Sequence, residues 1–187
     1  MVKRLQDGDK VAAREFYALF ADSLAGVCSR YIADEEDLKD VFQNALVHIF
    51  SHIADFRYRG EGSLQAWATK GVVNESLKFL REKKRHELLY ADAEVPDSAQ
   101  YAATSSQLDD PPPIDEISPD AVRQMLSRLP TGYRTVLNLY VFEGKSHQEI
   151  ARLLGIRKDS SASQLHRAKS LLAKMIRKYN EDNPPPR

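Results

Sequence analysis

The side chains best suited to contact another molecule lie near the end of the chain, on a helix expected to follow Arg157. Their hydroxyl, imidazole and guanidinium groups recur on one side, whereas Ser161, Leu165 and Ala168 fall on the other. A helix with a short, polar and basic face can enter the major groove of DNA, where such donors read base edges and Arg or Lys hold phosphates. We therefore predict a DNA contact through Arg157, Lys158, Ser160, Ser163, Gln164, His166, Arg167 and Lys169.

A helix-turn-helix would position that face. Ser146 and Glu149 have the spacing of a capping box, which satisfies two backbone donors that the start of a helix leaves unpaired. Ile150 and Leu154 then recur at helical spacing, and Gly155 supplies the permissive backbone that ends this first helix. An ordinary helical hairpin with a solvated outer face is the alternative interpretation.

A second basic surface is predicted on a loop and on the helix that Ser63 would cap and that would run to about Arg85. Basic and amide side chains recur along this helix at spacings of three and four, and Tyr58 lies between two arginines. Aromatic groups beside cations stack on single-stranded bases, at roughly 1–3 kcal/mol per base. The predicted contacts are Arg57, Tyr58, Arg59, Trp67, Lys70, Asn74, Lys78, Arg81 and Arg85.

Trp67 has an alternative role in the hydrophobic core, packed with Leu64 and Leu80. In that interpretation the basic stripe would only be solvated. The sequence favours neither role for Trp67, and it favours a function for the stripe.

A third candidate surface lies on a helix expected between residues 34 and 53. The acids that follow Asp34 suit the positive end of a helix dipole, so structure alone explains them. Ala45 and Ile49 would face a core. The opposite side, which we predict to meet a protein partner, contains Asp40, Gln43, Asn44 and Val47.

Patterns that would indicate catalysis or a bound metal are missing. His48 and His52 are four residues apart, but the adjacent Glu and the third ligand of a zinc protease motif are absent. The single cysteine, Cys28, has apolar neighbours and is expected in the core. There is neither a glycine-rich phosphate loop nor a nucleophile motif. We therefore predict a protein that is not an enzyme, with no catalytic residue, metal or cofactor.

The distribution of charge indicates two domains joined by an acidic linker. The 187 residues have no net charge, but nine acids and no Lys or Arg lie between residues 87 and 120, whereas the flanking segments are basic. The acidic segment lacks a sustained apolar period, as flexible linkers do. We expect domains at 1–86 and 118–179, a linker at 87–117 and a disordered tail at 180–187.

Apolar periodicity predicts an all-α fold. It runs over residues 12–20 and 24–32, ahead of the helices already named, and no strand signal appears. Ser118 followed by Pro119 marks a further helix start. No apolar run approaches the roughly 20 residues that span a bilayer, and the first residues lack the apolar core of a signal peptide. We therefore expect no membrane insertion and a cytoplasmic protein.

Taken in order, these segments resemble those of an extracytoplasmic-function (ECF) sigma factor of bacterial RNA polymerase. The resemblance covers about Leu5 to Ile176, and its motifs are Asp40–Leu46, Gly60–Trp67, Leu129–Arg134, Glu149–Ile156 and Ser163–Lys169. The chain departs from the family at several positions. Asn44 replaces an acid, Gly71 replaces a larger apolar residue, and Asp159, Ser160, Ser161 and Gln164 stand where many members have Gly-Thr-Val and Arg.

The resemblance implies a transcription initiation factor with two helical domains. The helix with Asp40 and Gln43 would bind the clamp helices of the largest subunit of core RNA polymerase. The loop at Tyr58 and the following helix would melt and read the minus-ten element as single strand, and the helix-turn-helix would bind the minus-thirty-five duplex. An anti-sigma protein is a further implied partner, and we hypothesise that the acidic linker passes through the cationic cleft of the polymerase.

Two other functions fit parts of the sequence. A stand-alone helix-turn-helix regulator would bind operators without polymerase, commonly as a dimer, and the face at Asp40 is the only dimer candidate. A helical adaptor that binds protein alone would leave the basic stripe unused, and its binding would show no steep salt dependence.

Overall fold

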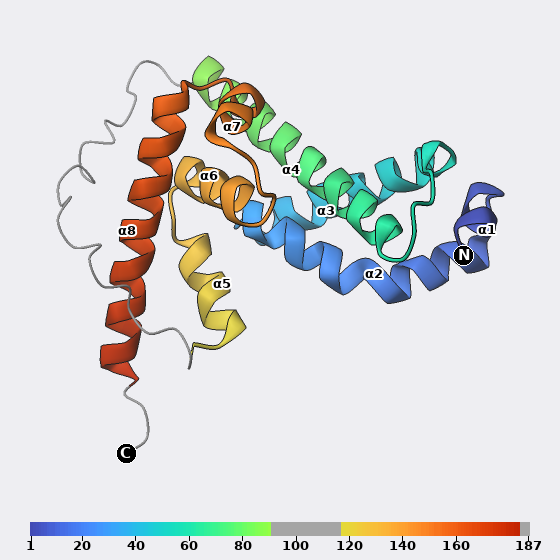
Figure 1. Ribbon diagram of the computed structural model, residues 1–187, viewed down its shortest axis with the longest axis horizontal. Helices are drawn as coiled ribbons and strands as arrows, with labels where there is room; N and C mark the ends of the chain where they lie inside the picture. The colour runs from blue at the N-terminus through green and yellow to red at the C-terminus, as the bar shows by residue number, and fades with distance from the viewer. Residues whose placement is uncertain (91–116, 184–187) are drawn as a thin grey trace. The chain divides into compact units, whose positions relative to one another are not determined.

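The computed structural model describes residues 1–90 and 117–183, except for the side chains of 84–90. All regular structure in these ranges is helical, as predicted (Figure 1). The chain forms two compact units, Met1–Leu89 and Tyr90–Arg187. Most of the expected linker and the last residues of the expected tail lie outside the described ranges. No helix in the described ranges is long and apolar enough to cross a membrane.

The first unit contains α1 (Val2–Gln6), α2 (Lys10–Tyr31), α3 (Glu35–Ser51), the 3-10 turn η1 (Ile53–Asp55) and α4 (Ser63–Tyr90). The carboxylate of Asp34 caps α3 by accepting hydrogen bonds from the backbone N–H groups of Glu36 and Asp37. The acids that follow it occupy the first turn, where the helix dipole favours negative charge. Apolar side chains of α2, α3 and α4 form the core. Its members include Phe16, Leu24, Cys28, Val41, Ala45, Ile49, Val72 and Leu77.

The extents of three helices differ from those expected from the sequence. The two segments predicted at 12–20 and 24–32 form the single helix α2, because the buried Ala21 continues the apolar face across the gap. Helix α4 continues to Tyr90, so the segment expected to begin the linker at Glu87 is helical. In the second unit, helix α8 (Lys158–Asp182) continues into the expected tail. The expected ends of α4 and α8 were inferred from polar composition, and both helices extend further.

The packing of α4 against Ile49 of α3 explains Gly71. A Cβ at this position would lie 3.1 Å from Cγ1 of Ile49, which is buried. The other glycine in the interior of a first-unit helix, Gly26 of α2, has no atom within 4 Å of the corresponding position. Gly71 therefore permits close packing, whereas Gly26 does not serve that purpose.

The substitution Gly26→Ala should stabilise the first unit, whereas Gly71→Ala should not. Alanine gains about 0.5–1 kcal/mol over glycine inside a helix. At position 71 overpacking against Ile49 opposes this gain, so we expect a net loss of about 0.5–1 kcal/mol. Urea unfolding followed by the fluorescence of Trp67 measures both effects. Equal stabilisation by the two substitutions would contradict tight packing of α3 on α4.

The second unit contains α5 (Pro119–Ser127), α6 (Thr131–Val141), α7 (His147–Leu154) and α8 (Lys158–Asp182). Ser118 caps α5 by accepting a hydrogen bond from Ala121, with Pro119 at the first helical position as predicted. The other three helices pack on α8, shown in red in Figure 1. Their shared core includes Met125, Leu129, Val136, Leu139, Ile150, Leu165 and Ala168.

Candidate nucleic-acid and protein interfaces

The predicted helix-turn-helix is present at α7 and α8. The Ser146 hydroxyl accepts the backbone N–H of Glu149 at 3.3 Å, and the Glu149 carboxylate accepts the backbone N–H of Ser146 at 2.8 Å, which completes the capping box. Gly155 ends α7 in the left-handed region, with φ 65° and ψ 35°. Helix α8 begins three residues later at Lys158. The capping box and the turn at Gly155 therefore position α8, the recognition helix that is predicted to contact DNA.

The capping box shifts the acidity of Glu149. Hydrogen bonds from the side chain and then the backbone of Ser146 lower the pKa of this carboxyl below its ordinary value, and the nearby charges of Lys145 and Arg152 act in the same direction. A carboxyl with a lowered pKa stabilises the fold when ionised. The start of α7 is therefore sensitive to acid.

Stability of the second unit should fall on acidification, in part through Glu149. This contribution is complete above the ordinary pKa of 4.5 and is lost as the pH falls through the lower value of the folded state. Glu149→Gln keeps the capping geometry but does not titrate, so its thermal midpoint should fall less between about pH 5 and pH 3. The exposed Glu181→Gln is the matched control. A pH dependence unchanged by Glu149→Gln would rule out this role.

The recognition helix is amphipathic, as predicted. Ser161, Leu165 and Ala168 are buried on one side. Of the predicted DNA contacts, Ser160 and Gln164 are half-buried. The exposed ones form the outward face of the helix-turn-helix and consist of Arg157, Lys158, Ser163, His166, Arg167 and Lys169.

Helix α6 holds several of these side chains. The Arg167 guanidinium donates to the Tyr133 hydroxyl at 3.3 Å, and the Lys169 ammonium lies 5.8 Å from the centre of the Tyr140 ring. Gln164 lies against the start of α6, because its Oε1 is 3.0 Å from where a Cβ of Gly132 would be. The face presented to a ligand is therefore positioned by α6, and Gln164 is the predicted contact most involved in packing.

His147 is a positioning residue that the sequence did not reveal. Its Nδ1 lies 3.0 Å from the hydroxyl of Ser161, which is fully buried, and its ring stacks on Tyr140 at 4.9 Å. A buried hydroxyl requires a hydrogen-bond partner, and His147 supplies it across the turn. The only indication of this contact in the sequence was Ser161, a polar residue on the buried side of α8, whose hydroxyl would need a partner.

In the first unit, the loop between η1 and α4 presents Tyr58. This side chain is 65% exposed, and the neighbouring Arg57 and Arg59 are exposed as well. The loop closes on Ser63, whose hydroxyl accepts the backbone N–H of Arg59 and donates to the carbonyl of Gly60. Ser63 was predicted to cap α4, but it is the first residue of that helix and its hydroxyl binds the loop.

Trp67 lies behind this loop. It is half-buried, and its ring is 5.3 Å from that of the buried Phe56. Phe56, at the start of the loop, is thus an aromatic packing partner of Trp67. Trp67 supports the segment that carries Tyr58 and keeps part of its own ring accessible.

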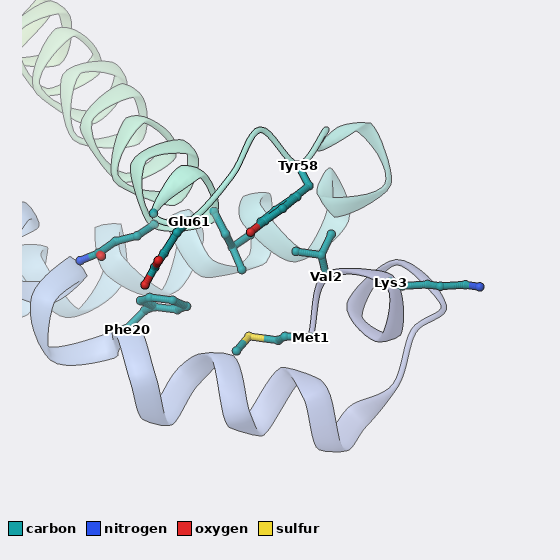
Figure 2. A pocket seen from close by; sticks show the side chains of 9 residues that line it. Met1, Val2, Lys3, Phe20, Tyr58 and Glu61 are labelled. Atoms are coloured by element: carbon teal, nitrogen blue, oxygen red, sulfur yellow. The ribbon is translucent and has the colours of Figure 1, made fainter.

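A pocket of about 720 Å³ opens beside Tyr58, a volume within the range of small-molecule sites. Its walls come from α1, from Phe20 of α2, from the loop and from the first turn of α4 (Figure 2). Tyr58 and Glu61 lie on the loop side, and Phe20 and Met1 lie across from them. An aromatic ring, apolar walls and a carboxylate suit a flat, partly polar ligand.

The basic stripe on α4 is accessible. Lys70, Asn74, Lys78 and Arg81 are all exposed. Glu75 forms an ion pair with Lys78 at 3.1 Å, and this hydrogen bond raises the pKa of Lys78. The backbone of Arg85 continues the helix, but its side chain is outside the described part of the structure. At least four positions are therefore available to a polyanion.

Helix α3 exposes the side predicted to meet a protein. Asp40, Gln43 and Asn44 are exposed, and the apolar Val47 is 60% exposed among them. The ring centres of His48 and His52 are 4.1 Å apart, with the rings tilted relative to each other. Among the described residues no three potential ligands are grouped to hold a metal. Cys28 is fully buried as expected, and burial raises the pKa of its thiol.

Known proteins share this arrangement. Residues 16–86 match the family described as Sigma-70 region 2, and residues 120–172 match Sigma-70, region 4. Together they cover about two thirds of the chain. The ECF RNA polymerase sigma-E factor of Haemophilus influenzae is 26% identical, over 94% of this chain and 93% of its own length. The ECF RNA polymerase sigma factor SigW of Bacillus subtilis is 25% identical, over 94% and 95% respectively.

A solved structure has the same fold. It is the sigma factor RpoE of Bartonella quintana in complex with the anti-sigma factor NepR, with a TM-score of 0.50 and 17% identity, covering 88% of this chain and 96% of that one. At that identity the likeness concerns the fold alone. One matched region lies in each compact unit, and the two relatives align with this chain over more than nine tenths of both lengths. The chain therefore belongs to the sigma-70 family of RNA polymerase sigma factors, in its extracytoplasmic-function group.

Proposed function

We propose that this chain directs core RNA polymerase to specific promoters and helps to open the DNA strands, as an ECF sigma factor. The observation that supports this function best is the pairing, in one chain, of a surface for duplex DNA with a surface for single strand. The helix-turn-helix presents a basic face on α8, and the first unit presents an exposed aromatic loop beside a pocket. A duplex-binding regulator has no need of the second surface.

In this mechanism the second unit binds the minus-thirty-five duplex. Ser163 and His166 of α8 would face base edges, and Arg157, Lys158 and Lys169 would hold phosphates on either side. Arg167 would reach DNA while Tyr133 orients it. These contacts recruit the promoter as duplex and require no strand separation.

The first unit would capture the opened minus-ten strand. Extruding a base costs a few kcal/mol, and stacking on Tyr58 with entry into the adjacent pocket offsets that cost. Lys70, Asn74 and Arg81 would follow the strand along α4, where phosphate contacts add affinity that weakens with salt. The energy for opening thus comes from binding one separated strand.

Protein partners complete the proposal. Asp40, Gln43, Asn44 and Val47 of α3 would dock on the clamp helices of the largest polymerase subunit, with Val47 as the apolar centre. The solved relative is bound to an anti-sigma factor, and we propose that a comparable inhibitor controls this chain. The chain would act as a non-catalytic subunit in the cytoplasm, where the polymerase and chromosome are.

Transcription by bacterial core polymerase on sheared genomic DNA, with and without this protein, tests the function. We expect discrete new starts that share an upstream motif. Because Val47 is exposed, the variant Val47→Asp should fold normally. It should abolish these starts while duplex binding persists. Unchanged transcription despite specific duplex binding would instead indicate a regulator that acts without polymerase.

A further inference from the structure

The short helix α1 is joined to the backbone that precedes the Tyr58 loop. The Nε2 of Gln6 donates to the carbonyl of Phe56 at 2.9 Å and to the carbonyl of Ile53 at 3.2 Å. Because both partners are acceptors, the amide nitrogen must face them, and its two hydrogens match the two oxygens. One side chain therefore fixes both ends of the η1 turn.

Helix α1 contacts the rest of the first unit through one buried side chain and two ion pairs. Leu5 is buried, and the Arg4 guanidinium forms ion pairs with Asp9 at 2.7 Å and with Glu15 at 3.1 Å. Asp9 also caps α2. Gln6 thus extends from a support that is anchored to α2, so its hydrogen bonds can set the position of the η1 turn.

Side-chain contacts anchor the loop that carries Tyr58 at both of its ends. Phe56 is held twice, by its carbonyl on Gln6 and by its ring on Trp67. At the other end Ser63 bonds to Arg59 and Gly60. Tyr58 lies on the short segment between these anchors, and α1 lines the same pocket through Met1, Val2 and Lys3 (Figure 2).

We propose that Gln6 is a positioning residue for strand capture, because its amide fixes the start of the loop that presents Tyr58 and its pocket. This inference rests on the proposed function of that loop. Gln6 itself touches no nucleic acid in this scheme. It makes α1, which lies outside the matched region of the family, part of the strand-opening apparatus.

The decisive variant is Gln6→Glu. A glutamate has the same shape, but it would place a carboxylate oxygen against two carbonyl oxygens, which repel it. The side chain is exposed overall, so the variant should swing into solvent and fold normally. The matched control is Gln124→Glu, the same change at an exposed position of α5 in the other unit.

The readout is binding of polymerase holoenzyme to a fluorescent single-stranded oligonucleotide, taken from the opened region of a promoter found by the transcription mapping. We expect Gln6→Glu to weaken this binding about tenfold, with a thermal midpoint only slightly lower. Affinity for core polymerase, which the same unit binds through α3, and affinity for the upstream duplex should not change. Gln124→Glu should bind as the unsubstituted protein does. A purely structural role would instead lower the midpoint markedly and weaken binding of core polymerase through α3 of the same unit, which would overturn the proposal.

Tyr58→Ala separates the two possible failures. If Tyr58→Ala weakens oligonucleotide binding but Gln6→Glu does not, the positioning role is wrong and the function of the loop stands. If neither variant weakens binding, the loop does not capture the strand, and both claims are wrong. Weakening by both variants, with the affinity for core polymerase preserved, supports the proposal.

Discussion

Replacing Tyr58 with alanine should weaken capture of the opened promoter strand by roughly 5- to 150-fold, which corresponds to about 1–3 kcal/mol of lost base stacking. The reason is its position. Tyr58 is 65% exposed and lines the pocket. Its ring therefore contributes little to the stability of the free protein, but it can stack on a base in the complex. Promoter opening should slow accordingly, whereas affinity for the minus-thirty-five duplex should not change.

Two control variants make this result interpretable. Tyr58→Phe keeps the ring and should retain most of the opening rate, because stacking needs no hydroxyl. Tyr17→Ala removes another exposed tyrosine, on α2 of the same unit, and should leave opening unchanged. Stopped-flow fluorescence of a promoter with a base analogue in the opened region measures the rate. Equal losses of duplex affinity and opening rate in Tyr58→Ala would contradict a role specific to single strand.

Features set by nearby residues were predictable from the sequence. The caps at Ser118 and Ser146 and the left-handed Gly155 are where they were expected, because each depends on groups only a few residues away. The buried stripe of α8 followed from helical periodicity in the same way. The locations of the exposed candidate residues were predictable for this reason, although exposure by itself does not establish binding.

Features set by contacts between distant segments were not predictable. The pocket beside Tyr58 needs α1 and Phe20, which are far from the loop in sequence. The pairing of His147 with Ser161 and the packing of Gly71 on Ile49 likewise depend on how helices meet. A glycine in a helix looks unfavourable by propensity alone, and only the tertiary structure shows the close approach that it permits.

The burial of Arg134 is the largest feature that the sequence did not predict, because charged residues are seldom fully buried. It is only 4% exposed on α6, and its guanidinium donates to the carbonyl of Ser127 at 2.8 Å and to that of Leu129 at 3.4 Å. These carbonyls belong to the end of α5 and the connection that follows, where backbone acceptors lack helical partners. Burial lowers the pKa of the guanidinium, although arginine stays charged at neutral pH. Arg134 therefore joins α5 to α6.

Arg134→Met should destabilise the second unit by about 2–3 kcal/mol, because charge-assisted hydrogen bonds to buried carbonyls contribute about 1.5–3 kcal/mol and methionine replaces only the packing. Arg134→Ala should lose about 3–5 kcal/mol, since it also leaves a cavity. Arg123→Met, at an exposed arginine of α5, should change stability by less than about 0.5 kcal/mol. Hydrogen exchange of the α5 and α6 amides in the full chain localises the loss.

The consequence should extend to DNA binding. Helix α6 orients Arg167 through Tyr133, the residue before Arg134. Loosening α6 should therefore lower affinity for the minus-thirty-five duplex even at temperatures where the second unit remains folded. Binding of the single-stranded oligonucleotide, which depends on the first unit, should be unaffected by Arg134→Met. A variant that lost both activities would show that the buried arginine supports more than the second unit, and one with unchanged exchange rates would show that its hydrogen bonds contribute no net stability.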